Sequence, residues 1–275
     1  MLIRHCILFT LYLLLWDYAS GESKFEPYEV NGGLVSAVAG KDFCIIAADT
    51  RMTSSGYLLN SRNHLSSRLW TVNDDPIMAR VEDSLRRSET AASLFERRLE
   101  QSKAPVMVGS SGCTADCRAL QIDLRADLRA ASYAGQVKLN DPNQIATSLS
   151  QTLYQRRGFP YYAFCVAAAI DSDSGRGHVY VYDAIGSYEQ VAVAASGTGK
   201  AGLQPILDRL FDTCNDTPRQ VEGTAASAIH KLCQAYRSVS EREIGVGDKL
   251  VLHVTEKADN GMVNCRVLVV PLKED

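Results

Sequence analysis

The sequence predicts an α/β protein built as a four-layer αββα sandwich, in which two antiparallel sheets pack face to face between two pairs of helices. Its short apolar runs lack the alternation of apolar and polar residues that marks a strand exposed on one face. Such runs are expected of strands covered on both faces. Amphipathic stripes follow in pairs between groups of strands, and this order argues against a doubly wound parallel sheet. We therefore expect one domain over residues 26–275, preceded by a separate segment over residues 1–25.

The first two predicted strands form a hairpin. Val35–Ala39 and Phe43–Ala48 are rich in small and β-branched residues, and Gly40-Lys41-Asp42 between them predicts a tight turn. The later strands are expected at Leu69–Val72, Val106–Gly109, Tyr162–Ile170, His178–Asp183, Gln190–Ala195, Lys249–Thr255 and Asn264–Val270.

Helices are expected where apolar residues recur every three or four positions. One such stripe runs from Cys117 to Ala131. Asp141-Pro142 predicts a capped start for the next helix, because Asp favours the N-cap and Pro the first turn. Thr217-Pro218 predicts in the same way the start of a helix that continues through Tyr236.

A Gly-rich stretch, Ser196-Gly197-Thr198-Gly199-Lys200, is similar to part of a phosphate-binding loop. The full pattern needs a glycine where Ala194 stands and a hydroxyl where Ala201 stands. Both are missing. The stretch is therefore interpreted as a turn that starts a helix at Leu203–Phe211.

Residues 76–103 lie between two predicted strands and carry apolar residues at spacings of three and four. This pattern predicts a long amphipathic helical insertion. Because the two helix pairs already cover both sheets, we expect the insertion to dock elsewhere on a larger assembly. A loop without regular structure remains the alternative, since Ser88 and Ala92 weaken the stripe.

Composition excludes several classes of function. A formal charge of −3 and a pI near 6.0 give no basic surplus, so nucleic acid is not expected as a partner. The eight cysteines are scattered, which predicts free buried thiols in a reducing compartment. The five histidines show neither metal-ligand spacing nor the setting of a serine-type triad. We expect no metal and no cofactor.

The N-terminal segment leaves two interpretations open. Residues 1–23 hold an apolar run from Cys6 to Trp16, preceded by Arg4 and followed by small residues. The run is too short to span a bilayer. It fits a secretory signal peptide or a removable pro-segment equally well.

Three motifs resemble a known family when they are taken in order. They are Gly32-Gly33 before the first strand, Ile45-Ile46-Ala47-Ala48-Asp49-Thr50-Arg51 closing the second, and Gly109-Ser110-Ser111-Gly112-Cys113-Thr114-Ala115-Asp116 opening the first helix. Together they resemble the β-type subunits of the 20S proteasome, which have the αββα fold of N-terminal-nucleophile hydrolases. The resemblance runs from about residue 26 to the C-terminus and is interrupted by residues 76–103.

The resemblance implies that the catalytic residues of the family are missing. Catalytic members use an N-terminal threonine whose α-amine is the base, supported by an aspartate and a lysine. The aspartate is kept as Asp49, but the threonine position falls on Gly33. The lysine position falls on Leu65, or on Ser66 when it is counted from Gly56.

Three further positions belong to the same pattern. Glu243 and Val246 stand where catalytic members carry an aspartate and a serine. Gly112, which in the family directs a backbone N–H toward the substrate carbonyl, is present. We therefore expect no catalytic, cofactor-binding or metal-binding residues.

The function implied is that of a non-catalytic structural β subunit of the 20S core particle, which completes the β ring for ATP- and ubiquitin-dependent protein degradation. Its expected partners are the other α and β subunits in stacked seven-membered rings, without nucleic acid or membrane, in the cytoplasm and nucleus. One alternative is an active threonine peptidase or amidohydrolase of this fold with a misplaced nucleophile. A secreted binding domain is the other, suggested by residues 1–23.

Overall fold

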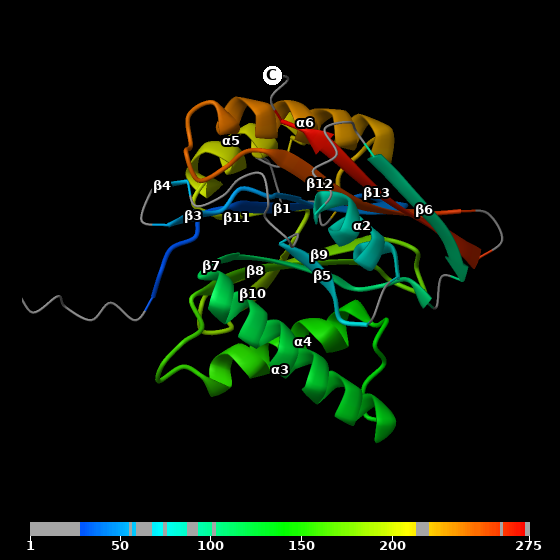
Figure 1. Ribbon diagram of the computed structural model, residues 1–275. Coiled ribbons are helices and arrows are strands. Elements are labelled where there is room, and N and C mark those ends of the chain that lie inside the picture. The colour runs from blue at the N-terminus through cyan, green and yellow to red at the C-terminus, as the bar shows by residue number, and fades with distance from the viewer. Residues whose placement is uncertain are drawn as a thin grey trace, which may run out of the picture.

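A computed structural model describes residues 28–54, 57–58, 68–73, 76–86, 93–100, 103–212, 220–258 and 261–272. It confirms the αββα sandwich: two antiparallel sheets pack face to face, and each carries two helices on its outer face (Figure 1). No helix within these ranges is long and apolar enough to cross a membrane.

The first sheet has six strands in the order β11-β1-β2-β12-β13-β6. Its strands are β1 (Leu34–Ala39), β2 (Phe43–Asp49), β6 (Ser93–Glu100), β11 (Val193–Gly197), β12 (Lys249–Lys257) and β13 (Met262–Pro271). The predicted opening hairpin is the β1–β2 pair, with Val38 opposite Ile45.

The second sheet has five strands in the order β10-β9-β8-β7-β5. Its strands are β5 (Leu69–Thr71), β7 (Met107–Gly112), β8 (Ala163–Ile170), β9 (Gly177–Tyr182) and β10 (Tyr188–Val191). A short separate hairpin pairs β3 (Thr53–Ser54) with β4 (Tyr57–Leu58). The predicted run Gln190–Ala195 is thus divided between β10 and β11, which belong to different sheets.

Two helix pairs form the outer layers. Helices α5 (Lys200–Leu210) and α6 (Ala225–Ser240) cover the six-stranded sheet, and α3 (Thr114–Tyr133) and α4 (Pro142–Gln155) cover the five-stranded one (Figure 1). The Asp141 side chain accepts hydrogen bonds from the N–H groups of Asn143 and Gln144, so it caps α4 as predicted. Helix α6 begins at Ala225, capped by Thr224. The predicted start was therefore too early, and Thr217 lies outside the described residues.

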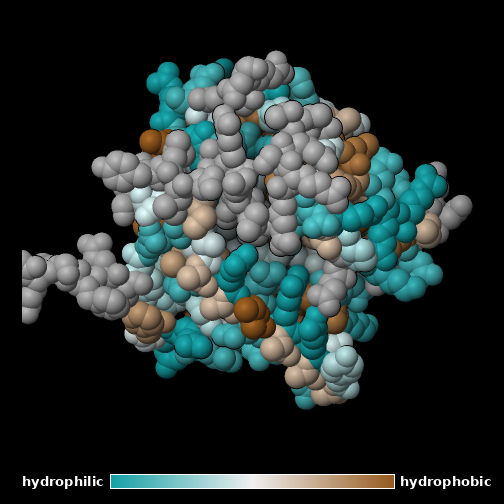
Figure 2. Space-filling model, in the orientation of Figure 1, coloured by the Kyte–Doolittle hydropathy of each residue, from teal (hydrophilic) through white to brown (hydrophobic). Residues whose placement is uncertain are grey.

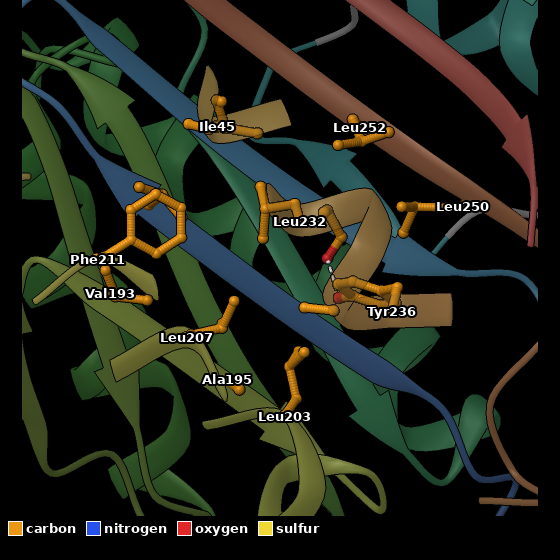
Figure 3. Packing of buried hydrophobic residues seen from close by; sticks show 14 of the residues in the cluster. Ile45, Val193, Ala195, Leu203, Leu207, Phe211, Leu232, Tyr236, Leu250 and Leu252 are labelled. Carbon is orange, nitrogen blue, oxygen red and sulfur yellow. Dashed lines mark hydrogen bonds between the residues drawn. The ribbon is translucent and has the colours of Figure 1, made fainter. Parts of the chain in front are cut away.

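The hydrophobic core has three layers, one between the sheets and one under each helix pair. Figure 3 shows part of the layer under α5 and α6, in which Leu203, Leu207 and Leu232 belong to the same buried cluster as Ile45 and Leu250. Tyr236 is fully buried there, and its hydroxyl reaches Ala47 O at 3.0 Å and Ser36 Oγ at 3.1 Å. The buried hydroxyl of Tyr236 is thus satisfied by the β1–β2 hairpin.

The predicted helical insertion is correct for its first part and wrong for its second. Residues 76–86 form helix α2 (Pro76–Arg86), but residues 93–100 form β6, which pairs antiparallel with β13. Phe95 and Leu99 lie four positions apart. This spacing puts two residues on one face of a helix and also on one face of a strand. Pairing with the otherwise open backbone edge of β13 favours the strand.

The insertion also packs on its own domain. Ile77 and Val81 of α2 are fully buried in the layer between the sheets, close to β6 and β13. The expectation that the insertion docks elsewhere is therefore wrong for α2. Figure 2 shows that the coloured residues of the face seen in Figure 1 are mostly hydrophilic, with hydrophobic residues only in small scattered groups.

Candidate functional site

The site begins with Gly33, which directly precedes β1. Its backbone is held on both sides: Gly33 N donates to Gly245 O at 3.0 Å, and Gly33 O accepts from Thr198 N at 3.0 Å. Its φ of +100° lies in a region that side chains rarely adopt. The residue is buried, so it meets the surrounding structure rather than solvent.

Asp49 is the last residue of β2, and its side chain is fully buried. Its Oδ1 accepts from Leu34 N at 2.8 Å, while its Oδ2 accepts from Gly247 N at 3.0 Å and Arg51 N at 3.3 Å. One carboxylate therefore ties the starts of β1 and β12 to the end of β2. Such bonds satisfy three buried backbone donors that would otherwise lack partners.

The positive charge beside Asp49 comes from Arg68. Its Nε lies 3.2 Å from Asp49 Oδ1, and the two side chains are 5% and 0% exposed. Its Nη2 also donates to Arg51 O and to Asn31 O, the latter at 3.4 Å. Burial raises the pKa of the Asp49 carboxyl, and the Arg68 guanidinium together with the backbone donors opposes that rise.

The Arg68 guanidinium fills the space that a side chain at position 33 would need. A Cβ built on Gly33 would lie 1.9 Å from Arg68 Cζ and 2.1 Å from Nε. A threonine therefore cannot stand at this position unless Arg68 moves away from Asp49. Guanidinium also stays protonated at any pH a protein tolerates, so it cannot exchange protons as a lysine does.

Arg68 was missed in the sequence. Counting from Asp49 placed the lysine position at Leu65, and counting from Gly56 placed it at Ser66. Both residues lie outside the described part of the chain. Arg68 stands directly before the apolar run Leu69–Val72, which was predicted as a strand, and this position could have identified it. Its place relative to that strand is certain, whereas turns of unknown length separate it from Asp49.

Asn31, in the segment before Gly33, bridges strands β7 and β3. Its backbone N donates to Gly112 O of β7 at 3.0 Å, and its backbone O accepts from Thr53 N of β3 at 3.2 Å. The Asn31 side chain repeats this bridge, donating to Thr53 O at 3.1 Å and accepting from Thr114 N at 2.8 Å. Gly112 O, Thr53 O and Thr114 N are thus bonded within the chain.

Glu243 and Val246 shape the opposite side of the site. Glu243 Oε1 accepts from Gly245 N at 3.1 Å, which orients the turn whose carbonyl binds Gly33 N. Val246 is fully buried in the core layer under α5 and α6. The positions that carry polar residues in catalytic members thus serve the turn and the core here.

Gly33 has no side chain, so this residue supplies no nucleophile. Among the described residues the hydroxyl nearest to Gly33 in the hydrogen-bond network is that of Thr198, which donates to Gly33 O at 3.4 Å. Thr198 lies inside the chain and so has no α-amine to act as its base. No group of three or more metal-binding side chains occurs in the described part of the chain.

The described cysteines are free, as predicted. Four are buried (Cys44, Cys113, Cys165 and Cys265), and two are intermediate (Cys117 and Cys233). Burial raises the pKa of Cys44 to about 12 and that of Cys117 to about 11, so both thiols are protonated at neutral pH. They are packing residues and not nucleophiles.

Comparison with known proteins identifies the family. A family model described as "Proteasome subunit" matches residues 85–250. The chain is 32% identical over 255 residues to "Proteasome subunit beta type-1-B" of Carassius auratus, covering 92% of this chain and 91% of that protein. It is 34% identical over 242 residues to "Proteasome subunit beta type-1" of Arabidopsis thaliana, covering 86% and 92%. The chain therefore belongs to the proteasome subunit family.

Proposed function

We propose that this chain is a non-catalytic β subunit of the 20S core particle, of the beta type-1 kind. It completes the β ring and contributes to the wall of the degradation chamber, while neighbouring subunits carry the threonine nucleophiles. Its partners are the other α and β subunits in stacked seven-membered rings, in the cytoplasm and nucleus. Similarity to proteins named proteasome subunit beta type-1 supports this assignment.

One observation carries the absence of peptidase activity. Under this proposal the nucleophile position falls on Gly33. The space that a side chain there would need is occupied by the Arg68 guanidinium, which is paired with Asp49. Losing the hydroxyl alone could be reversed by one substitution. Filling its space with a buried ion pair cannot, because the residues of a catalytic unit act together.

The test uses the native particle, purified through an affinity tag on this chain. An epoxyketone that reacts with N-terminal threonines is added, and each subunit is weighed by intact-mass spectrometry. We expect adducts on neighbouring subunits and none on this chain, with about thirteen related proteins of similar size co-purifying. An adduct on this chain, or its recovery without such partners, would contradict the proposal.

The same particle tests whether the site can be restored. Gly33→Thr should give no new turnover and no adduct, because the hydroxyl would lie against a guanidinium rather than beside a free amine. N-terminal sequencing of the mature chain is the control. A mature chain that begins at Ser, Thr or Cys would favour the alternative of an active hydrolase with a misplaced nucleophile.

A further inference from the structure

Strand β6 leaves one backbone edge of the six-stranded sheet open. It stands last in the strand order, and among the described strands only β13 pairs with it (Figure 1). The backbone N–H and C=O groups of a strand point alternately to its two sides, so about half of those of β6 face away from β13. Such an edge is a template on which another chain can add a strand.

The composition of β6 does little to prevent such pairing. Proteins that protect an edge shorten it, bend it, or place proline or lysine on it. The strand β6 has eight residues, SLFERRLE, without proline, glycine or lysine. Its charged residues are two glutamates and two arginines, so charge alone does not repel every partner. The edge is therefore suited to a strand whose charges match its own.

The two faces of β6 differ in character. Phe95 and Leu99 are partly buried against the core layer between the sheets. Glu96 and Arg98 are exposed on the other face, where mostly charged residues of β6, β12 and β13 line an open hollow of about 470 Å³. A strand added to this edge would therefore meet apolar side chains on one face and charged side chains on the other.

The described strands leave the charges of Glu96 and Arg98 available to a neighbour. The residue opposite Glu96 on β13 is Arg266, whose guanidinium pairs with Glu256 instead. Arg98 donates from Nε to Asn264 Oδ1 at 3.0 Å, which uses one of the five N–H donors of its guanidinium. A carboxylate and a guanidinium thus stand two positions apart on the exposed face.

A second copy of β6 fits this pattern in one antiparallel register. Opposite residues share a face, so the register can shift only by two residues at a time. When the two-fold axis passes through Arg97, Glu96 of each copy stands opposite Arg98 of the other, and Phe95 stands opposite Leu99. Pairs of both kinds stabilise antiparallel strands. An axis through Glu96 or through Arg98 would place like charges opposite each other.

We propose that β6 is a self-association strand, through which two copies of this chain pair edge to edge and join their six-stranded sheets into one. The proposal rests on the open edge and on charge complementarity, so it does not depend on the proposed function. A strand of eight residues makes a small interface. We expect a weak dimer, with a dissociation constant of about 10 to 100 µM.

One residue opposes the pairing and makes the proposal sharper. In this register Arg97 of one copy stands opposite Arg97 of the other, and like charges opposite each other are destabilising. Arg97→Gln removes this repulsion and leaves the Glu96–Arg98 pairs in place. It should therefore tighten the dimer about threefold.

The experiment exchanges charges and follows self-association of the purified full chain by sedimentation velocity. Glu96→Arg and Arg98→Glu each turn both Glu–Arg pairs into like-charge pairs, so each should weaken the dimer about tenfold. An equimolar mixture of the two variants should regain the parent affinity, because one strand is then positive at both positions and the other is negative at both. Glu241→Arg is the matched control, since it makes the same change of charge at an exposed residue after α6.

Cross-linking tests the register. Arg97→Cys places one thiol of each copy directly opposite the other, about 5 Å apart and within reach of a short bismaleimide. Leu94→Cys is the control, because Leu94 stands opposite Glu100 in this register and its two thiols would lie about 20 Å apart. We expect a linked dimer from Arg97→Cys alone. The parent chain should give none, because its described cysteines are buried or partly buried.

Each outcome decides the proposal. A parent chain that stays monomeric at about ten times the upper expected dissociation constant overturns it. Two other results also overturn it: a mixture that associates no better than the single variants, and linking of Leu94→Cys as readily as Arg97→Cys. Association that ignores the charge changes would show that another surface is used. Failure here leaves the subunit assignment intact, since that assignment is tested by co-purification and by the mass of the chain.

Discussion

Under the proposed function, the Gly33 site and the insertion at residues 76–103 depart from the pattern of a catalytic subunit in opposite ways. At the Gly33 site the backbone frame is kept while the chemistry is changed: Asp49 still ends β2, but Arg68 occupies the space that a side chain at position 33 would need. In the insertion the frame itself is changed, because β6 adds the sixth strand of the sheet, at its edge beside β13. There the core is extended rather than altered.

The difference shows which residues serve the fold. Asp49 holds three backbone N–H groups, so it is needed for the fold even where no reaction takes place. Gly33 has no side chain and therefore no such structural task. An insertion is tolerated at the sheet edge because it can bury its own apolar residues and pair the open strand, at little cost to the residues already there.

The largest effect should come from removing Arg68. Arg68→Met leaves the Asp49 carboxylate buried without its charge partner, which should lower the free energy of unfolding by about 3 to 5 kcal/mol. Chemical denaturation of the variant and the parent chain measures this. Arg176→Met is the control, because Arg176 is exposed and should change stability by less than about 0.5 kcal/mol.

The pH dependence of the same variant tests the cause. Burial raises the pKa of the Asp49 carboxyl, and losing Arg68 removes a group that opposes the rise. A carboxyl with a raised pKa in the folded state binds more protons there, so stability falls as pH increases through that pKa. The deficit of Arg68→Met should therefore shrink as pH falls toward the ordinary range of a carboxyl group. A deficit that does not change with pH would contradict the role given to the charge.

The second effect concerns the space at Gly33. Gly33→Ala combines an unfavourable φ of +100° with a Cβ 1.9 Å from Arg68, and should cost about 3 kcal/mol. Gly223→Ala separates the two causes, because Gly223 has a φ of +111° and open space around its Cβ. It should cost about 1 kcal/mol. Equal costs would mean that Arg68 does not fill the space beside Gly33.

Much of this site could be predicted from the sequence, because its parts lie on short, strongly apolar strands. The β1–β2 hairpin fixes Asp49 and Gly33 relative to each other through a turn of only three residues. Arg68 was not found, because it lies 19 positions after Asp49, and the length of the intervening turns cannot be read from their composition.

The insertion could be predicted only in part, for a different reason. A spacing of four is shared by helices and strands, so Phe95 and Leu99 fit both. The sequence holds no local signal for β13 as a partner, since pairing depends on which edge of the sheet is open. The same limit explains why α2 was expected to dock elsewhere: its apolar face fills the end of the core between the sheets, and the size of that space is a property of the folded domain.

The smallest expected effect tests the claim that the insertion is part of the core. Ile77 is fully buried in the layer between the sheets, so Ile77→Ala should cost about 2 kcal/mol, near the lower end for such a truncation because the site lies at the edge of the layer. Arg80→Ala is the control on the same helix. Its guanidinium lies 6.0 Å from the Phe95 ring, a contact worth at most about 1 kcal/mol at an exposed site.

Hydrogen exchange gives the insertion test a second measurement. Half of the β6 amides point toward β13, and their pairing should slow exchange well below the rate of a free peptide. Ile77→Ala should speed exchange in β6 and leave β1 unchanged, because α2 contacts β6 and β13 directly. If the β6 amides exchange at the free-peptide rate in the parent chain, the strand is not part of the sheet. The comparison with the Gly33 site would then fail on that side, because an insertion that adds no strand and buries nothing has not changed the frame.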